Sequence, residues 1–217
     1  MIDSPSELNV AQTENPVKRI LARYKHAKSI KDQWVSVFEE CYEYALPQRE
    51  SFFQESIGSR RTDHIFDETA VVGVQEFASR LQSGIVPNYA RWAEFVAGSE
   101  IPKELQKETN LALDEITEYV FEVLQNSNFS QEVHETFLDI ALGTGVLLVE
   151  EGDAVQPVRF KAIPLPQVCL TSGYDDKVDA VYRTRKMKLK ELTFAYAQPI
   201  YNDKMAMDME ANPDKEI

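Results

Sequence analysis

Residues 58–98 read GSRRTDHIFDETAVVGVQEFASRLQSGIVPNYARWAEFVAG, and the rest of the chain is organised around this stretch. Asp67 stands where a helix N-cap is expected, and Glu68 follows in the first turn, where a negative charge suits the helix dipole. Apolar residues then recur every three or four positions, which predicts a helix with one apolar face. This face consists of Val71, Val74, Ala78, Leu81 and Ile85.

Gly84 and Pro87 mark the end of this predicted helix, because both residue types stop helices. Residues 91–96 then read as a short extended segment, in which Trp92 is expected to be a large buried anchor. Trp34 lies in the helix predicted upstream and is interpreted in the same way. Because truncation of a buried tryptophan typically costs ~3–5 kcal/mol, we expect Trp92→Ala to be strongly destabilising.

The composition indicates a globular protein. With 217 residues, 43% of them hydrophobic and 10% aromatic, the chain can build a sizeable core in one or two domains. The net charge of −13 argues against a protein that grips nucleic-acid phosphates over its whole surface. No apolar run approaches the ~20 residues of a membrane span, and the first residues do not resemble a signal peptide. Cys41 and Cys169 have no metal or redox spacing, so we interpret them as buried thiols in a reducing compartment.

The N-terminal part is predicted to be a loose arm, residues 1–15, followed by a helix. Asn15 and Pro16 suit the N-cap and the first turn, and the apolar pattern extends to Leu46. A pattern similar to a capping box at Ser29 leaves a break there open. An unbroken helix of about 30 residues would span ~45 Å, which suits a radial strut in a large assembly. A helix folded back on its own domain is the equally open alternative.

A second long helix is predicted from Ile101 to about Asn126, with a shorter one that starts at Ser130. The remaining faces of the long helix are acidic, which is typical of a solvated surface, although such a surface can also meet a basic partner. The apolar face expected to be buried consists of Leu105, Thr109, Ala112, Ile116, Tyr119 and Val123.

The pair Gly143 and Gly145 separates helices from strands. A phosphate-binding loop requires the order strand, glycine turn, helix, whereas here the order is helix, glycine turn, strand. We therefore interpret Gly143 as the end of a helix and expect no ATP hydrolysis. No nucleophile–base pair, metal cluster or cofactor fingerprint is found in the sequence, so no catalytic, cofactor-binding or metal site is predicted.

Four strands are predicted after the glycines, at 146–150, 158–163, 168–171 and 178–185. Gly152–Asp153 and Gly173–Asp176 supply hairpin turns, and the aspartates near the second turn are attributed to turn formation and not to calcium. A short helix, 189–196, closes this region, and residues 198–217 show no pattern.

Basic residues gather in two places. The loop 48–64 contains Arg49, Arg60, Arg61 and His64, and it is either a basic patch near nucleic acid, a contact to an acidic neighbouring subunit, or an ordinary exposed loop. The densest basic run follows the last predicted strand. The candidate patch for DNA or for a subunit interface consists of Arg60, Arg61, Arg183, Arg185, Lys186, Lys188 and Lys190.

Several short motifs occur in the same order as in one known family, across about residues 20 to 190. They resemble the head-to-tail connector, or portal, proteins of short-tailed bacteriophages. The motifs include a Tyr-Ala-Leu-Pro-Gln-Arg helix end at 44–49, a helix that starts Phe-Asp-Glu-Thr-Ala, and Ser-Asn-Phe at 127–129. The matching positions used below are Trp34, Pro47, Phe66, Asp67, Thr69, Ala70, Gly84, Pro87, Trp92, Gly143 and Gly145.

This resemblance implies a fold of the α+β class, with long amphipathic helices followed by a small antiparallel sheet, similar to the family's outer, wing-like part. It implies a homo-oligomeric ring, typically dodecameric, at one capsid vertex of a virion assembled in the host cytoplasm. Double-stranded DNA would pass through the ring without sequence specificity. The partners implied are the terminase motor, the capsid protein and a tail adaptor, with no membrane and no cofactor.

The resemblance also suggests how the chain is divided. We expect an arm at 1–15, a helical wing-like region at 16–143, a β-rich region with a closing helix at 144–197 and a mobile, truncated continuation at 198–217. The family continues beyond the matched motifs, so we expect the chain to be a portion of a longer polypeptide that forms no stable ring alone. A virion scaffold or adaptor without a channel is the alternative function, and an enzyme is the third.

Overall fold

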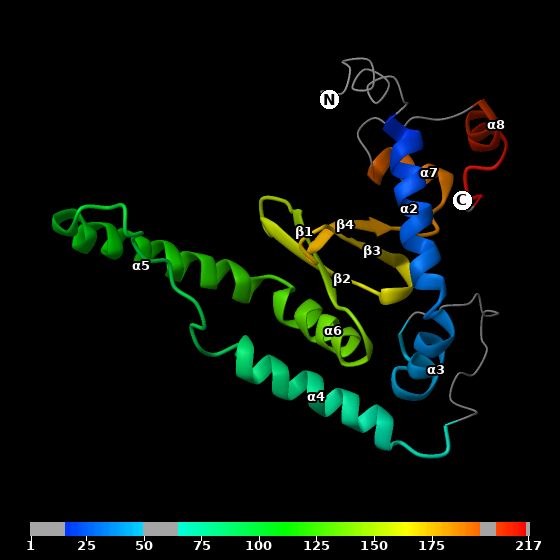
Figure 1. Ribbon diagram of the computed structural model, residues 1–217. Helices are drawn as coiled ribbons and strands as arrows, with labels where there is room; N and C mark the ends of the chain where they lie inside the picture. The colour runs from blue at the N-terminus through cyan, green and yellow to red at the C-terminus, as the bar shows by residue number, and fades with distance from the viewer. Residues whose placement is uncertain (1–15, 50–64, 196–202, 216–217) are drawn as a thin grey trace, which may run out of the picture. The chain divides into compact units, whose positions relative to one another are not determined.

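The computed structural model describes residues 16–49, 65–195 and 203–215. Within these ranges the chain forms seven α-helices and two antiparallel two-stranded sheets (Figure 1), which confirms the α+β class. The chain divides into two compact units, Met1–Val181 and Tyr182–Ile217. No helix in the described ranges is both long enough and apolar enough to cross a membrane.

The first predicted helix is two helices, α2 (Pro16–Asp32) and α3 (Val35–Ala45). The break lies at Gln33 and Trp34, four residues after the position that the sequence suggested. There the amide of Trp34 donates to the carbonyl of Lys31 at 2.8 Å, so the chain closes a tight turn before α3 begins. The prediction of one unbroken helix of about 30 residues is therefore wrong.

Helix α4 (Thr69–Ile85) starts as predicted, with one correction. The carboxylate of Asp67 accepts hydrogen bonds from the amide of Thr69 at 2.8 Å and from its hydroxyl at 2.6 Å, and these bonds lower the pKa of Asp67. Glu68 occupies the N-cap position and not the first turn. The helix continues through Gly84 and ends before Pro87.

Near the middle of α4, Ala78 is fully buried against helix α6 (Phe129–Leu142), beside which α4 runs (Figure 1). Most of the predicted α4 stripe is at least half-buried, but Ile85 is exposed. The buried residues of this core are Tyr42, Leu46, Ala78, Leu138 and Leu165.

Helix α5 (Lys103–Asn126) has the predicted extent, but the face predicted to be buried is wrong. Thr117 and Phe121 are buried instead. The cause is the preceding segment, which contributes backbone donors: the amide of Phe95 donates to the hydroxyl of Thr117 at 3.1 Å, and Ala97 donates to Asn110 at 2.8 Å. The face of α5 that carries Thr117 and Phe121 therefore packs against the preceding segment, while Leu105, Ala112, Ile116 and Tyr119 are exposed.

Both tryptophans are more exposed than the sequence suggested: Trp34 is 57% exposed and Trp92 is 40% exposed. Trp34 lies at the break between α2 and α3, at the N-cap position of α3. Trp92 packs on aromatic rings only in part, stacked on Phe129 at 6.1 Å and edge-on to Phe121 at 5.4 Å between ring centroids. The interpretation of both as buried anchors is wrong, and the cost of Trp92→Ala should fall below the ~3 kcal/mol that marks a buried tryptophan.

The sheets follow the prediction closely. Strand β1 (Val146–Glu151) pairs antiparallel with β2 (Val158–Ile163), with Val146 opposite Ile163. A short turn of 3₁₀-helix, Leu165–Gln167, leads to β3 (Val168–Ser172), which pairs with β4 (Val178–Arg183). The amide of Gly173 donates to the carbonyl of Lys177 at 2.8 Å, which closes the second hairpin as expected.

The second unit contains α7 (Leu189–Ala195), close to its predicted extent, and α8 (Asp203–Ala211). No element was predicted after residue 198, so α8 corrects the sequence analysis. Its Met205 and Met209 pack against the buried side chains Met187, Leu189 and Leu192. The sequence signal for α8 is weak, because the apolar side of this helix consists of only a few methionines, which are flexible.

Two glycines of the family motif are expected to respond in opposite ways to alanine. A Cβ at Gly145 would lie 2.7 Å from the carbonyl oxygen of Thr136, so Gly145→Ala should cost ~1–3 kcal/mol. A Cβ at Gly84, inside α4, would meet nothing within 4 Å, so Gly84→Ala should stabilise by ~0.5–1 kcal/mol. Urea unfolding of the two variants tests this, and equal effects would contradict it.

Candidate functional site

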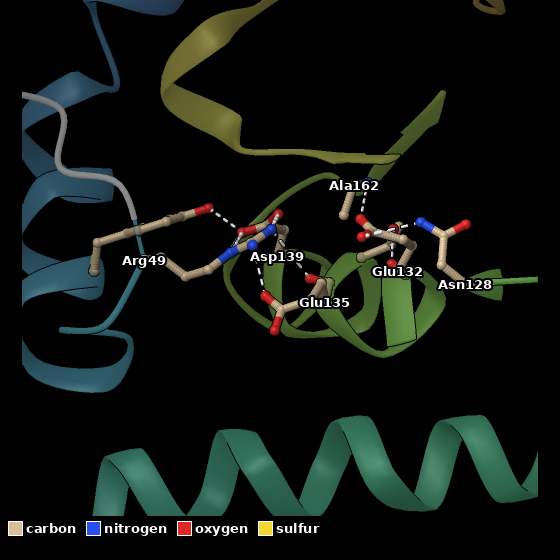
Figure 2. A network of polar contacts seen from close by, with 8 residues as sticks. Arg49, Asn128, Glu132, Glu135, Asp139 and Ala162 are labelled. Carbon is tan, nitrogen blue, oxygen red and sulfur yellow. Dashed lines mark hydrogen bonds and ion pairs between the residues drawn. The ribbon is translucent and has the colours of Figure 1, made fainter. Parts of the chain in front are cut away.

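Helix α6 presents acidic side chains on one face, at spacings of three and four: Glu132, Glu135 and Asp139. Figure 2 shows Arg49, from the segment after α3, reaching Asp139 and Glu135, while Glu132 and Asn128 lie further along toward Ala162. These side chains attach two other parts of the fold to α6. We treat this group, called the α6 cluster below, as the candidate functional site.

The centre of the cluster is a charged carboxylate without solvent contact. Asp139 is 0% exposed, and Arg49 forms an ion pair with it through both Nε and Nη2. Nη1 of Arg49 pairs with Glu135 at 2.6 Å. The hydroxyl of Tyr42 donates to Oδ1 of Asp139 at 2.6 Å. The two carboxylate oxygens of Asp139 are therefore both satisfied, as a buried charge requires.

The electrostatics follow from this geometry. Burial raises the pKa of Tyr42, and the charge and hydrogen bond of Asp139 raise it further. Burial alone would lower the pKa of Arg49, but the hydrogen bond and charge of Asp139 outweigh it and raise the pKa. Arg49 consequently stays charged and Tyr42 stays protonated over the physiological pH range.

The N-terminal end of α6 binds the free edge of β2. The side-chain amide of Asn128 donates to the carbonyl of Phe160 at 2.8 Å and accepts from its backbone N–H at 3.0 Å. The carboxylate of Glu132 accepts from the N–H of Ala162 at 2.7 Å. Because β2 pairs with β1 on its other side only, these side chains take the place of a third strand.

The predicted cap of α6 is wrong, because Asn128 and not Ser130 precedes the helix. The side chain of Asn128 is used by β2, and the hydroxyl of Ser127 accepts from the N–H of Phe129 at 3.1 Å instead. Gly143 follows the last turn of α6, and its amide donates to the carbonyl of Asp139 at 2.9 Å. The expectation that Gly143 ends the helix is confirmed.

The structure describes only some of the residues of the candidate basic patch, and not all of these are exposed. Arg60 and Arg61 lie outside the described residues, as does His64. Arg49, from the same loop, belongs to the buried cluster and not to a surface patch. In the second unit, Lys188 and Lys190 pair with Asp214 at 3.5 and 2.5 Å, which raises the pKa of Lys190. Arg185, Lys186 and Lys190 are exposed, while Arg183 and Lys188 are half-buried.

The family-motif residues have mostly structural positions. Pro47 is buried after α3, Pro87 is half-buried after α4, and Thr69 is held by Asp67. Phe66 and Ala70 are exposed. The core of the cluster, Tyr42 with Asp139, was missed, although a spacing of three and four between acidic residues on an amphipathic helix was visible in the sequence.

Lys31 makes a further, half-buried polar contact that the sequence did not indicate. Its ammonium donates to the carbonyls of Leu165 at 2.8 Å and Pro166 at 2.7 Å, which ties α2 to the turn before β3. Burial lowers the pKa of Lys31. Like the α6 cluster, this contact fixes one element against another.

The side chains of the α6 cluster hold elements of the fold together and are not arranged for catalysis. The carboxylate of Asp139 is engaged by Arg49 and Tyr42, so it is not available as a general base. Across residues 16–49, 65–195 and 203–215, no group of three His, Cys, Asp or Glu side chains is arranged to hold a metal ion. Cys41 and Cys169 are not joined in a disulfide; Cys169 is buried, and Cys41 is half-buried.

Removing the buried charge should be costly. Asp139→Asn is expected to lower the free energy of unfolding by ~3 kcal/mol, because Arg49 then lacks its main partner in a buried position. Glu76→Gln, which breaks the exposed pair with Arg80 on α4, should cost less than ~0.5 kcal/mol. Denaturant unfolding of both variants measures the difference, and equal small losses would show that the cluster contributes little.

The raised pKa of Tyr42 predicts a specific loss of stability in alkali. A group with a higher pKa in the folded state stabilises fully below its unfolded pKa, here 10.0, and this contribution is lost as the pH rises above it. Unfolding free energies of wild type and Tyr42→Phe should therefore converge above pH 10. A constant difference between pH 8 and pH 11 would contradict the assigned hydrogen bond.

Comparison with known proteins matches residues 17–217 to the family described as bacteriophage head to tail connecting protein. The probable portal protein of Bordetella phage BPP-1 is 23% identical over 187 residues, which are 83% of this chain and 32% of that relative. The chain thus spans about a third of the relative's length. The match confirms the resemblance drawn from the motifs. The chain belongs to the family of bacteriophage head to tail connecting proteins.

Proposed function

We propose that this chain is a structural part of a portal, the connector ring at one vertex of a phage capsid through which DNA is packaged and ejected. The observation that carries the proposal is the family match over residues 17–217, to which the portal relative adds support. The α6 cluster fits the role, because it holds α3 through the Arg49–Asp139 ion pair and the edge of β2 through hydrogen bonds, and its central carboxylate is already engaged.

The finer parts of the proposal come from the family. They are a homo-oligomeric ring, which we take to be dodecameric, and partners that comprise the capsid protein, a terminase motor and a tail adaptor. The site of action is the head–tail junction of the virion, after assembly in the host cytoplasm. The chain itself would hydrolyse no ATP, and the motor would supply that activity.

The location is tested by electron microscopy of phage particles that carry a peptide tag on this chain. We expect one labelled vertex per particle, at the head–tail junction, and unfilled capsids when the chain is missing. Label spread over the shell, or filled capsids in its absence, would favour the scaffold or adaptor alternative.

A conduit must let DNA slide, so the chain should hold duplex DNA weakly. The net charge of −13 supports this, because affinity for DNA depends on cations that neutralise phosphates. We expect no binding at submicromolar concentration in fluorescence anisotropy at physiological salt. Weak binding at low salt should decrease in Arg185→Glu/Lys186→Glu. Tight binding at physiological salt would count against the conduit.

A further inference from the structure

Helix α5 carries an apolar face that is exposed in the part of the chain that the structure describes. Leu105 is 53% exposed, Ile116 50% and Tyr119 64%, although their spacing is that of a buried helix face. The opposite face, with Thr117 and Phe121, is the one that packs. A row of large apolar side chains on an exposed helix is typical of an interaction surface.

Beside this apolar face runs a line of acidic residues one heptad apart, Glu108, Glu115 and Glu122. In the part of the chain that the structure describes, none of the three forms an ion pair. Their neighbours differ in this respect, because Arg91 pairs with Asp114 at 2.6 Å and with Glu118 at 3.8 Å. The outer surface of α5 is therefore apolar along one side and negatively charged along the adjoining side.

Helix α2 has the complementary character. Leu21 is 49% exposed, and Lys18, Lys25 and Lys28 lie three, four and seven residues from it, toward one side of the helix. No ion pair of these three lysines is found among the described residues, whereas Arg23, elsewhere on α2, pairs with Asp179. The helix contains one acidic residue, Asp32, and its basic residues are Lys18, Arg19, Arg23, Lys25, Lys28 and Lys31.

We propose that the outer face of α5 in one copy docks against the lysine-bearing face of α2 in the next copy. Leu21 of α2 would meet the apolar face of α5, with Glu108, Glu115 and Glu122 directed toward Lys18, Lys25 and Lys28. Such a contact joins two different surfaces, so each copy has one of each to offer, and repetition gives a closed ring or an open array. The inference rests on the proposed function, which requires the chain to self-associate.

A single helix-to-helix contact of this kind is small, and small interfaces are weak. Its strength in an assembly comes from repetition, since every copy is held on two sides. The charged rows serve mainly to choose the partner surface and register, because like charges placed opposite each other are disfavoured. Reversal of one row should therefore disrupt the contact, and reversal of both rows should restore it.

The first experiment is sedimentation velocity of the purified chain over a concentration series. Wild type should self-associate. We expect at least ~10-fold weaker association for each of the two charge reversals, K18E/K25E/K28E and E108K/E115K/E122K. The variant that combines both reversals should associate to within ~3-fold of wild type. The control R80E/K161E/K177E makes the same change in net charge as the first variant, at exposed positions outside α2, α5 and the candidate basic patch, and should leave association unchanged. Circular dichroism confirms that each variant is folded.

The second experiment identifies the surfaces directly. Equal amounts of ¹⁵N-labelled and unlabelled chain are joined by a carbodiimide, which links a lysine to a carboxylate in contact with it. Mass spectrometry should find mixed-isotope links between the three α2 lysines and the three α5 glutamates. Links within one chain only, links elsewhere, or a chain that remains monomeric at ~100 μM would each overturn the proposal, because the interface would then be absent.

The outcomes separate this inference from the proposed function. If the tagged chain lies at one capsid vertex but the links map to other surfaces, the α2–α5 contact is wrong and the portal role stands. If K18E/K25E/K28E loses binding to a duplex DNA probe while its self-association is unchanged, α2 binds nucleic acid and the inference is wrong.

Discussion

The fold depends on one buried charge. The carboxylate of Asp139 has no contact with solvent, and removing a charge from water is costly unless ion pairs and hydrogen bonds replace the lost hydration. Arg49 and Tyr42 supply that replacement from the segment that ends α3, which is therefore held against α6. An apolar contact could slide, whereas the fork of an arginine on a carboxylate fixes both distance and orientation. The pair thus selects one arrangement of the two helices.

At its N-terminal end, helix α6 also satisfies the open edge of strand β2. A two-stranded sheet leaves strand edges with open backbone groups, and β2 has its edge satisfied by the side chains of Asn128 and Glu132. Helix α6 therefore joins helices on one side and the first sheet on the other, without a loop or ligand between them.

The sequence predicted the strands almost to the residue, because hydrophobic alternation and hairpin glycines are local signals. It did not predict the cluster, since Asp139 and Arg49 are far apart in the chain. The residue type alone does not show whether an aspartate is buried or exposed. The apolar face of α5 was a different kind of error. Periodicity showed that Leu105, Ile116 and Tyr119 form one face, but it cannot show whether the surface that covers this face belongs to the same chain. Trp34 and Trp92 were misassigned for a different reason, since large apolar side chains do not show where the chain turns: Trp34 lies at the break between α2 and α3, and Trp92 packs only in part on Phe121 and Phe129.

The interior and the exposed faces differ in their response to salt. The Arg49–Asp139 pair is shielded from ions by the protein around it, whereas exposed lysines and glutamates are screened over a Debye length of about 8 Å at physiological ionic strength. Added salt therefore weakens contacts between exposed charged surfaces at lower concentrations than those that affect the Arg49–Asp139 pair. If copies of the chain associate through exposed charged faces as proposed, added salt should separate them while each copy keeps its fold.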